Sequence, residues 1–224
     1  MPSKLLNTIM NNKNWLNVFV DKYSQLLDIR TSGAQRGLKE GIYQRSKGFQ
    51  IIFETMFKNK NQNFNIIETG TIRKPNNWKD GNSGFLFAEL TKMHGGLVKS
   101  VDINQKAVDT ANNFVNSKHY TAYCSDSVAW LKQQTDLDQI DLFYLDSYDV
   151  EWSDDEPSAT HHLNEFLVIE PFLNSGKILA IDDNSFLISG KRTGKGRKIY
   201  EYLEKKSILP MYDAYQIIYV FNNL

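Results

Sequence analysis

The chain has 224 residues, enough for one α/β domain with a helical extension and a substantial buried core. Charged residues make up 23% of the composition and balance to a formal net charge of zero, which excludes a global electrostatic attraction to nucleic acids or anionic membranes. Cys124 is the single cysteine, so an intrachain disulfide and a cysteine-rich zinc site are also excluded.

Two features of the sequence bear on where the protein works. The first residues contain no apolar core of a signal peptide, and no apolar run reaches the roughly 20 residues that a membrane-spanning helix needs. We therefore expect a cytoplasmic protein with neither a membrane nor a nucleic acid as partner. A homo-oligomer is compatible with the sequence.

Helical patterns come first along the chain. Apolar residues recur at the spacing of one helix face over residues 4–29 and again over Tyr43–Lys58. We interpret residues 1–60 as an N-terminal helical cap and residues 61–224 as the main domain.

The main domain alternates between strand and helix patterns. Strands are expected at Phe64–Thr69, Leu97–Asp102, Tyr120–Cys124, Ile140–Asp146, Lys177–Ile181 and, as a terminal hairpin, Leu209–Tyr212 and Gln216–Phe221. Helices are expected at Gly84–His94, Gln105–Ser117, Ser127–Gln134, His161–Leu173 and Lys195–Lys206. This alternation predicts a mostly parallel, doubly wound sheet, in which ligands bind at the carboxyl ends of the strands.

The first of these strand ends is Glu68-Thr69-Gly70-Thr71. A glycine after a strand lets the backbone turn sharply and approach a ligand closely, and a neighbouring carboxylate accepts hydrogen bonds or meets an ammonium group. An ordinary strand-to-loop turn explains the same residues equally well. The motif is not GxGxxG, so a dinucleotide cradle has little support.

Acidic residues also follow the next two strands. Asp102 is placed to hold both hydroxyls of a ribose, and Asp126, within Ser125-Asp126-Ser127, to accept a hydrogen bond from an adenine amino group. The alternative for each is a helix N-cap, which is common at such positions.

Asp146 and Asp182-Asp183-Asn184 close two neighbouring strands. Three acids and an amide that converge offer the oxygen ligands that Mg²⁺ prefers, and we favour a divalent metal there. The alternative is that each acid caps a loop or pairs with Lys or Arg.

Two further segments carry candidate functional groups. His161 and His162 open a predicted helix, and either suits a general base or a metal ligand, although a histidine in the core or at a helix cap is equally ordinary. The basic segment Gly190–Lys198 is expected to form a mobile lid, a clamp for an anionic substrate group, or a solvated loop.

The set of strand ends resembles the successive motifs of class I S-adenosylmethionine-dependent methyltransferases. The resemblance rests on Ile67–Thr71, Ser100–Asp102, Cys124–Ser127 and Asp141–Asp146, and it covers about residues 45 to 221. Leu145-Asp146 with Ile181–Asn184 is similar to the metal-dependent O-methyltransferases of the catechol, macrolide-sugar and cephalosporin-tailoring types. The resemblance to class I methyltransferases implies a Rossmann-like, mostly parallel sheet of seven strands, with helices on both faces and an antiparallel C-terminal strand.

The resemblance also implies roles for individual residues. The cofactor-binding set is Glu68, Gly70, Thr71, Ser83, Asp102, Ser125, Asp126, Ser127 and Asp146. The metal set is Asp146, Asp182, Asp183 and Asn184, in which the third ligand is ambiguous, and the catalytic set is His161, His162 and Asp146. The long insertion Ile72–Asn82 departs from the family pattern, and the lysine base of the catechol type has no clear counterpart.

The sequence thus predicts metal-assisted O-methylation of a small hydroxylated acceptor, with S-adenosylmethionine and a divalent metal, Mg²⁺ above all, as cofactors. Two alternatives stay open, a cofactor-binding protein without methyl transfer and a nucleotide-dependent oxidoreductase.

Overall fold

The structure is a computed structural model, and it describes residues 14–28, 45–80 and 82–221. The helix expected over residues 4–29 is present from residue 14, with a π-helical stretch η1 (Val20–Ser24) and a last turn α2 (Gln25–Leu27). Its first ten expected residues lie outside the described part, as do residue 29 and Tyr43.

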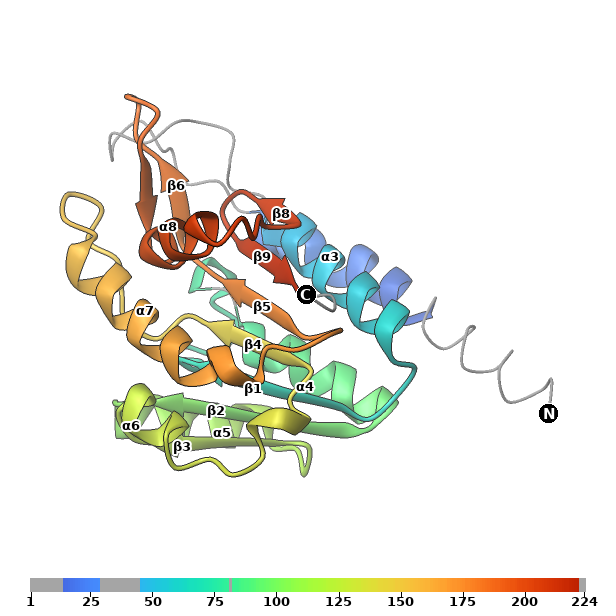
Figure 1. Cartoon of the computed structure of the whole chain (residues 1–224). Coiled ribbons are helices and arrows are strands. Elements are labelled where there is room, and N and C mark those ends of the chain that lie inside the picture. Colours follow the sequence, from blue (N-terminus) through green and yellow to red (C-terminus); the bar gives the residue numbers. More distant parts are fainter. Residues whose placement is uncertain (1–13, 29–44, 81, 222–224) are drawn as a thin grey trace.

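Seven strands form one sheet in the order β3-β2-β1-β4-β5-β9-β8 (Figure 1). They are β1 (Phe64–Thr69), β2 (Gly96–Asp102), β3 (Tyr120–Cys124), β4 (Leu142–Leu145), β5 (Ile178–Ile181), β8 (Tyr212–Asp213) and β9 (Ile217–Val220). The first five are parallel, whereas β9 runs antiparallel to β5 and to β8. The predicted fold, a mostly parallel sheet with an antiparallel edge, is therefore confirmed.

Helices pack on both faces of the sheet because successive strand residues point to opposite sides. The longer ones are α3 (Arg45–Asn59), α4 (Ser83–His94), α5 (Gln105–Val115), α6 (Ser127–Leu131), α7 (Glu156–Ile169) and α8 (Arg197–Lys205). Single turns are η3 (Trp78–Asp80), η4 (Leu137–Gln139) and η5 (Glu170–Phe172). In β4, Leu142 and Tyr144 face the core on the α3–α4–α5 side, whereas Phe143 and Leu145 face α6, α7 and α8.

The described helices of the predicted N-terminal cap pack in the first of these cores. Trp15 and Phe19 pack on α3, and Phe49 of α3 stacks on Tyr144 of β4 with ring centroids 5.6 Å apart. Residues on either side of the predicted boundary at residue 60 therefore share one apolar cluster.

Three elements differ from expectation. Helix α7 begins at Glu156, five residues before the expected His161, because Pro157 suits the first turn of a helix. Strand β8 is only Tyr212–Asp213, since Pro210 lacks the N–H that a longer ladder would need. The basic segment is not a free loop, because its residues form β7 (Arg192–Gly194), which pairs antiparallel with β6 (Asn184–Phe186).

The register of the sheet aligns the carboxyl ends of the parallel strands. Thr69 is paired with Leu145, Leu145 with Ile181, and Asp102 with Cys124. The loops that follow these strands consequently meet at one edge of the sheet, which is where the fold class binds its ligands.

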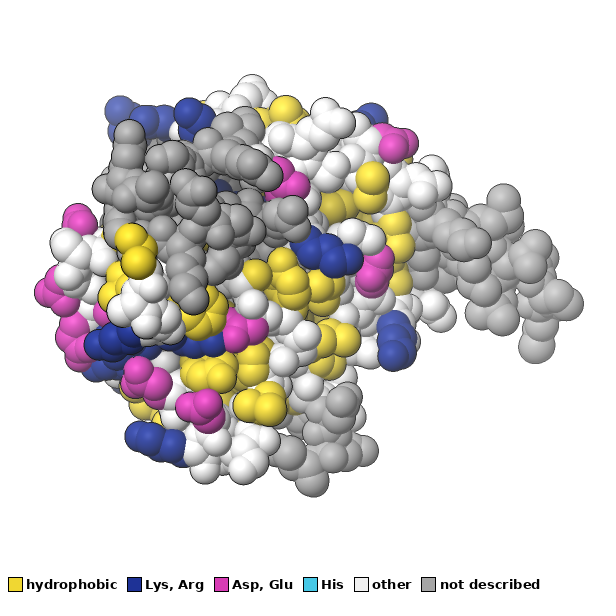
Figure 2. Space-filling model, turned by 90° about the horizontal axis from the view of Figure 1, so that it is seen from above, with side chains coloured by type: hydrophobic (Ala, Val, Ile, Leu, Met, Phe, Trp, Pro, Cys, Tyr) yellow, Lys and Arg dark blue, Asp and Glu magenta, His cyan; other side chains and the backbone are white. Residues whose placement is uncertain are grey.

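The surface seen in Figure 2 carries basic and acidic side chains interspersed with apolar ones. Among the described residues of that face, neither the basic nor the acidic side chains form one continuous patch. No helix among the described residues has both the length and the apolar composition needed to cross a membrane.

Phe49 gives a direct test of the packing of α3 against the sheet. The side chain is fully buried among Phe53, Phe87 and Tyr144, so Phe49→Ala should lower the free energy of unfolding in urea by about 3–5 kcal/mol. Leu209→Ala is the control, because that side chain is 67% exposed and its loss should cost less than about 0.5 kcal/mol. Equal, small effects for both variants would show that α3 does not pack as described.

Candidate functional site

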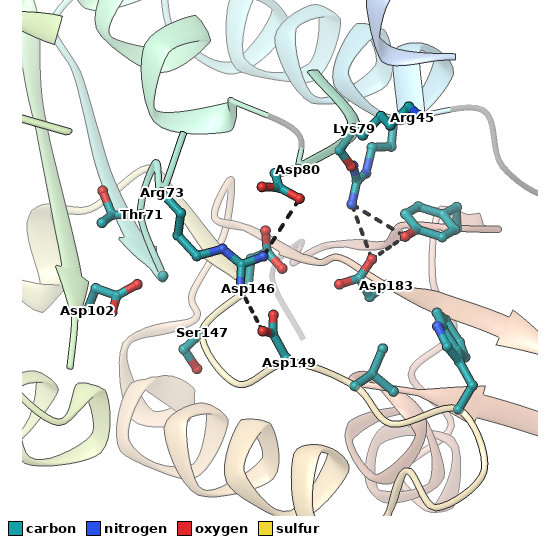
Figure 3. A pocket seen from close by; sticks show the side chains of 14 residues that line it. Arg45, Thr71, Arg73, Lys79, Asp80, Asp102, Asp146, Ser147, Asp149 and Asp183 are labelled. Atoms are coloured by element: carbon teal, nitrogen blue, oxygen red, sulfur yellow. Dashed lines mark hydrogen bonds and ion pairs between the residues drawn. The ribbon is translucent and has the colours of Figure 1, made fainter. Parts of the chain in front are cut away.

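Two adjoining cavities lie at the carboxyl edge of the sheet. The larger, of about 430 Å³, is bordered by the loop after β1, the loop after β4 and the end of β5 (Figure 3). The smaller, of about 200 Å³, lies over the ends of β2 and β3. Asp102 and Ser147 line both, so the two cavities are continuous with one another at these residues.

Gly70 forms the floor of the larger cavity where β1 ends. Its φ of +87° is in the left-handed region, and its N–H donates to the Val101 carbonyl at 2.7 Å. A Cβ at this position would lie 2.4 Å from the Asp146 carbonyl oxygen. Glycine is therefore required here for the ends of β1 and β4 to approach each other.

The smaller cavity has apolar walls and a few polar groups. Asp102 accepts a hydrogen bond from the Asn104 N–H at 2.8 Å, and burial raises the pKa of its carboxyl. Asp126 caps α6 by accepting from the Ala129 N–H at 2.8 Å and also lines this cavity, so the N-cap role and the pocket position coexist. Ser125 lies between them and donates its N–H to the Asp102 carbonyl, and it does not border either cavity.

The two histidines face different surroundings. His161 lines the smaller cavity, where its Nε2 contacts Ser127 Oγ at 2.8 Å and the Glu165 carboxylate at 3.3 Å. A hydrogen bond to Glu165 raises the pKa of His161. His162 is fully buried against the Ser158 carbonyl, and desolvation lowers its pKa to about 4. Neither imidazole lines the larger cavity, where the acidic strand ends lie.

Glu68 and Ser83 lie beneath the cavities and do not line them. Glu68 is 1% exposed, and its carboxylate accepts hydrogen bonds from Ser83 and Ser100. Burial is the main cause that raises the pKa of Glu68, to about 7. These contacts give Glu68 and Ser83 a structural position between β1, β2 and the start of α4 rather than direct access to a ligand.

The insertion after β1 contributes a cationic arm to the larger cavity. Arg73 reaches across it and pairs with Asp149 at 2.6 Å and with Asp80 at 3.8 Å (Figure 3). Thr71 lines the same wall, and its Oγ1 contacts the Tyr120 hydroxyl at 2.7 Å. Both Arg73 pairs are largely exposed and screened by solvent, so their contribution to stability is small.

Three predicted metal ligands do come together, but each is paired with a basic side chain. Lys195, which is 1% exposed, contacts Asp146 and lies 2.9 Å from Asp183. Arg45 lies 3.0 Å from Asp182 and 3.1 Å from Asp183. We call these five residues the charge cluster. It corresponds to the alternative in which the acids pair with Lys or Arg.

The charge cluster does not fit a divalent metal. The two Asp183 oxygens are already bound, one by Arg45 and the Tyr215 hydroxyl and the other by Lys195. Over residues 14–28, 45–80 and 82–221 there is no group of three or more His, Cys, Asp or Glu side chains arranged to hold a metal ion. The described residues therefore do not support the predicted magnesium site.

Asn184, the fourth predicted metal ligand, is hydrogen-bonded to the backbone. Its amide nitrogen donates to the Ile181 carbonyl at 2.8 Å and the Asp182 carbonyl at 3.0 Å, and its oxygen accepts from the Gly196 N–H at 2.7 Å. Because the amide is occupied by backbone groups on both ends, it holds the turn after β5.

The charges of the cluster shift one another's pKa values. Burial opposes protonation of Lys195, but Asp146 and Asp183 outweigh it and raise the pKa of the ammonium. Burial raises the pKa of the Asp146 carboxyl well above its usual range, against the opposing charge of Lys195. Desolvation also acts on the half-buried Asp183, yet Lys195 and Arg45 lower its pKa. Burial thus raises the proton affinity of Asp146, whereas the two cations lower that of Asp183.

The β6–β7 hairpin brings Lys195 to this position. Gly194 has a φ of +111°, and a Cβ there would lie 2.3 Å from the Asp183 carbonyl oxygen. A Cβ on Gly196 would lie 2.7 Å from the Asn184 amide oxygen. Asp155 then holds the hairpin to α7 by accepting from the Gly194 N–H at 2.8 Å and from Arg197. In the sequence, the feature that marks Lys195 is the glycine on each side of it, Gly194 and Gly196.

Comparisons with known proteins bear on the fold. No family model matches the chain, and a search of curated proteins finds no match. Among solved structures, the chain is similar to the MycE methyltransferase from the mycinamycin biosynthetic pathway, solved in complex with Mg, S-adenosylhomocysteine and mycinamycin VI. The two are 12% identical, the alignment covers 89% of this chain and 53% of MycE, and the TM-score is 0.52.

The chain has the fold of class I methyltransferases. It spans about half the length of MycE. A ribosomal protein L11 methylase from Lactobacillus delbrueckii subsp. bulgaricus is 14% identical over 84% of each chain, with a TM-score of 0.49. A TehB-like methyltransferase from Corynebacterium glutamicum is 12% identical over 76% of this chain and 86% of its own, with a TM-score of 0.45. The assignment rests on the strand order and on MycE.

Glu68 predicts a pH dependence of stability. Folding raises the pKa of Glu68 from 4.5 to about 7, so the ionised carboxylate destabilises the folded chain. This destabilisation is absent below pH 4.5 and complete above pH 7. Over that interval the free energy of unfolding of the unaltered chain should fall by about 3 kcal/mol relative to Glu68→Gln.

Urea denaturation at a series of pH values measures this difference. Glu151→Gln, at an exposed position, is the matched control and should follow the unaltered chain. Parallel curves for Glu68→Gln and the unaltered chain would contradict the burial of an ionisable Glu68.

Proposed function

We propose that this protein is an S-adenosylmethionine-dependent methyltransferase that acts on a hydroxyl group of a small acceptor. The observation that carries the proposal is the pair of adjoining cavities at the carboxyl edge of a class I methyltransferase sheet, joined at Asp102 and Ser147. In this class of fold that edge is where cofactors bind.

The smaller cavity suits the adenosine part of the cofactor. Its walls include Val101, Ile103 and the Tyr148 ring, which offer apolar contact to an adenine. Asp126 and Ser127 supply polar groups at the same cavity, and Asp102 lies where the two cavities meet. We propose that Asp102 holds the ribose hydroxyls, since one carboxylate accepts two hydrogen bonds in that geometry.

The larger cavity suits the methionine part of the cofactor together with the acceptor. Its volume of about 430 Å³ falls in the range of small-molecule sites, about 300–1,000 Å³. Gly70 and Thr71 border it on one side and Trp152 on another. The close approach of the Gly70 backbone leaves room for a ligand that a side chain at this position would exclude.

When bound, S-adenosylmethionine supplies an activated methyl group, so the chain has only to align the acceptor and take up its proton. The acceptor oxygen forms a bond to the methyl carbon while the carbon–sulfur bond breaks and its electron pair stays on sulfur. We propose Asp146 as the general base that receives the acceptor proton. It lines the larger cavity, and its raised pKa makes it a better proton acceptor than Asp183.

This assignment of the base differs from the histidines that the sequence suggested. His161 borders the cavity proposed for adenine, and His162 is buried against a backbone carbonyl. We propose that His161 instead orders the adenine end through Ser127 and Glu165.

Asp102→Ala tests the cofactor site. The variant should lose binding of S-adenosylhomocysteine by at least about 100-fold in isothermal titration calorimetry, because two charge-assisted hydrogen bonds are removed. Asp109→Ala, on the exposed side of α5, is the control and should bind as the unaltered chain does. Binding unchanged in Asp102→Ala would contradict the ribose assignment.

Asp146→Asn tests the base. It should leave S-adenosylhomocysteine affinity within about threefold and reduce turnover by about 10²–10⁴-fold, the usual contribution of general base catalysis. Turnover is measured as S-adenosylhomocysteine release with a panel of sugar, phenol and polyketide hydroxyl compounds, and as a product heavier by one methyl group. Asp154→Asn, an exposed residue of the same loop, is the control. Full turnover in Asp146→Asn would overturn the assignment.

A further inference from the structure

The charge cluster has an arrangement that the proposed reaction does not by itself require. Three carboxylates, on Asp146, Asp182 and Asp183, face two cations, on Lys195 and Arg45. Asp182, Lys195 and Arg45 are buried, whereas Asp146 and Asp183 are half-buried. Charges taken out of water are costly unless each has a partner, and the cluster supplies those partners from within the chain.

Lys195 occupies the position between the ends of β4 and β5. Its Nζ lies between the Asp146 carboxylate and an Asp183 oxygen 2.9 Å away, and it is 3.4 Å from the Asp146 carbonyl oxygen. A divalent cation that used these two carboxylate oxygens would compete with the ammonium for them. The ammonium and a divalent cation therefore exclude each other at these oxygens.

The hairpin makes the ammonium a permanent part of the site. Lys195 donates its backbone N–H to the Asp183 carbonyl at 3.1 Å, and the neighbouring Gly196 N–H is held by Asn184. These bonds and the close approach of Gly194 and Gly196 fix the backbone on both sides of the lysine. The backbone is fixed and the side chain is 1% exposed, so the ammonium is held against Asp146 and Asp183.

We propose that Lys195 takes the place of a divalent metal in this protein, so that methyl transfer proceeds without a metal ion and Lys195 is the residue that positions the Asp146 carboxylate. Three carboxylates against two cations leave one negative charge for the acceptor proton. No co-reactant beyond the methyl donor and the hydroxyl acceptor is needed, because that proton passes to Asp146.

The inference rests on the proposed function, because only a methyltransferase site gives Lys195 a metal to replace. Its test measures metal binding and needs no turnover. Mn²⁺ binding is followed by electron paramagnetic resonance in the full chain after treatment with a chelator. The unaltered chain should show no saturable Mn²⁺ site with a dissociation constant of about 1 mM or tighter. Lys195→Ala should gain one, since it frees the facing oxygens of Asp146 and Asp183.

Thermal unfolding gives a second readout that a purely structural lysine would not produce. Lys195→Ala should unfold about 10 °C lower than the unaltered chain in chelator, because two half-buried carboxylates lose a partner, and Mn²⁺ should restore most of the loss. Lys195→Met keeps most of the buried stem and serves if the alanine variant does not fold. Lys191→Ala, on the exposed turn of the same hairpin, is the matched control and should change neither readout.

The removal of one carboxylate distinguishes the outcomes. The Mn²⁺ site gained in Lys195→Ala should disappear in the double variant Lys195→Ala with Asp183→Asn. A saturable Mn²⁺ site in the unaltered chain that is lost in Asp183→Asn would overturn the inference, as would a folded Lys195→Ala that binds no Mn²⁺. Binding of S-adenosylhomocysteine, measured on the same samples, judges the proposed function separately.

Discussion

The contact of the Lys195 ammonium with Asp146 and Asp183 is the interaction on which the arrangement of the candidate site depends. It joins the ends of two neighbouring parallel strands, which carry acids that would otherwise repel one another in a buried setting. Arg45 of α3 supplies the second cation by pairing with Asp182 and Asp183. A buried ion pair of this kind adds little net stability but is costly to break, so it favours one arrangement of its elements over others.

Several parts of the fold serve this contact. The β6–β7 hairpin is fixed to the end of β5 by Asn184 and to the start of α7 by Asp155. Helix α3 is fixed by its aromatic side chains against β4, which places Arg45 at the first turn of the helix beside Asp182. The N-terminal helices are therefore part of the site as well as part of the core.

The position of the charge cluster also explains the division of the cavities. The smaller cavity has apolar walls at Val101 and Ile103 and an aromatic ring at Tyr148, which suit a flat aromatic ligand group. The larger one is lined by acids and by Arg45 and Arg73, which suits polar ligand groups and proton transfer. Of the two histidines proposed from the sequence as general base or metal ligand, His161 lies at the smaller cavity and His162 lies in the core.

The sequence by itself determined the fold class and the edge of the sheet where the site lies. Strand-to-helix alternation and an acid after nearly every strand are local patterns, and they predicted β1 to β5 and the positions of Asp102, Asp126 and Asp146. Only the tertiary structure decided which partner each acid has. Asp146 and Asp183 are 37 positions apart and Lys195 follows 12 later, so their meeting depends on strand register and on a hairpin held by two glycines. In a sequence, an aspartate that binds a metal looks the same as an aspartate that pairs with a lysine. Which of the two it becomes depends on the cation that the fold brings within 3 Å of it, here the Lys195 ammonium beside Asp183.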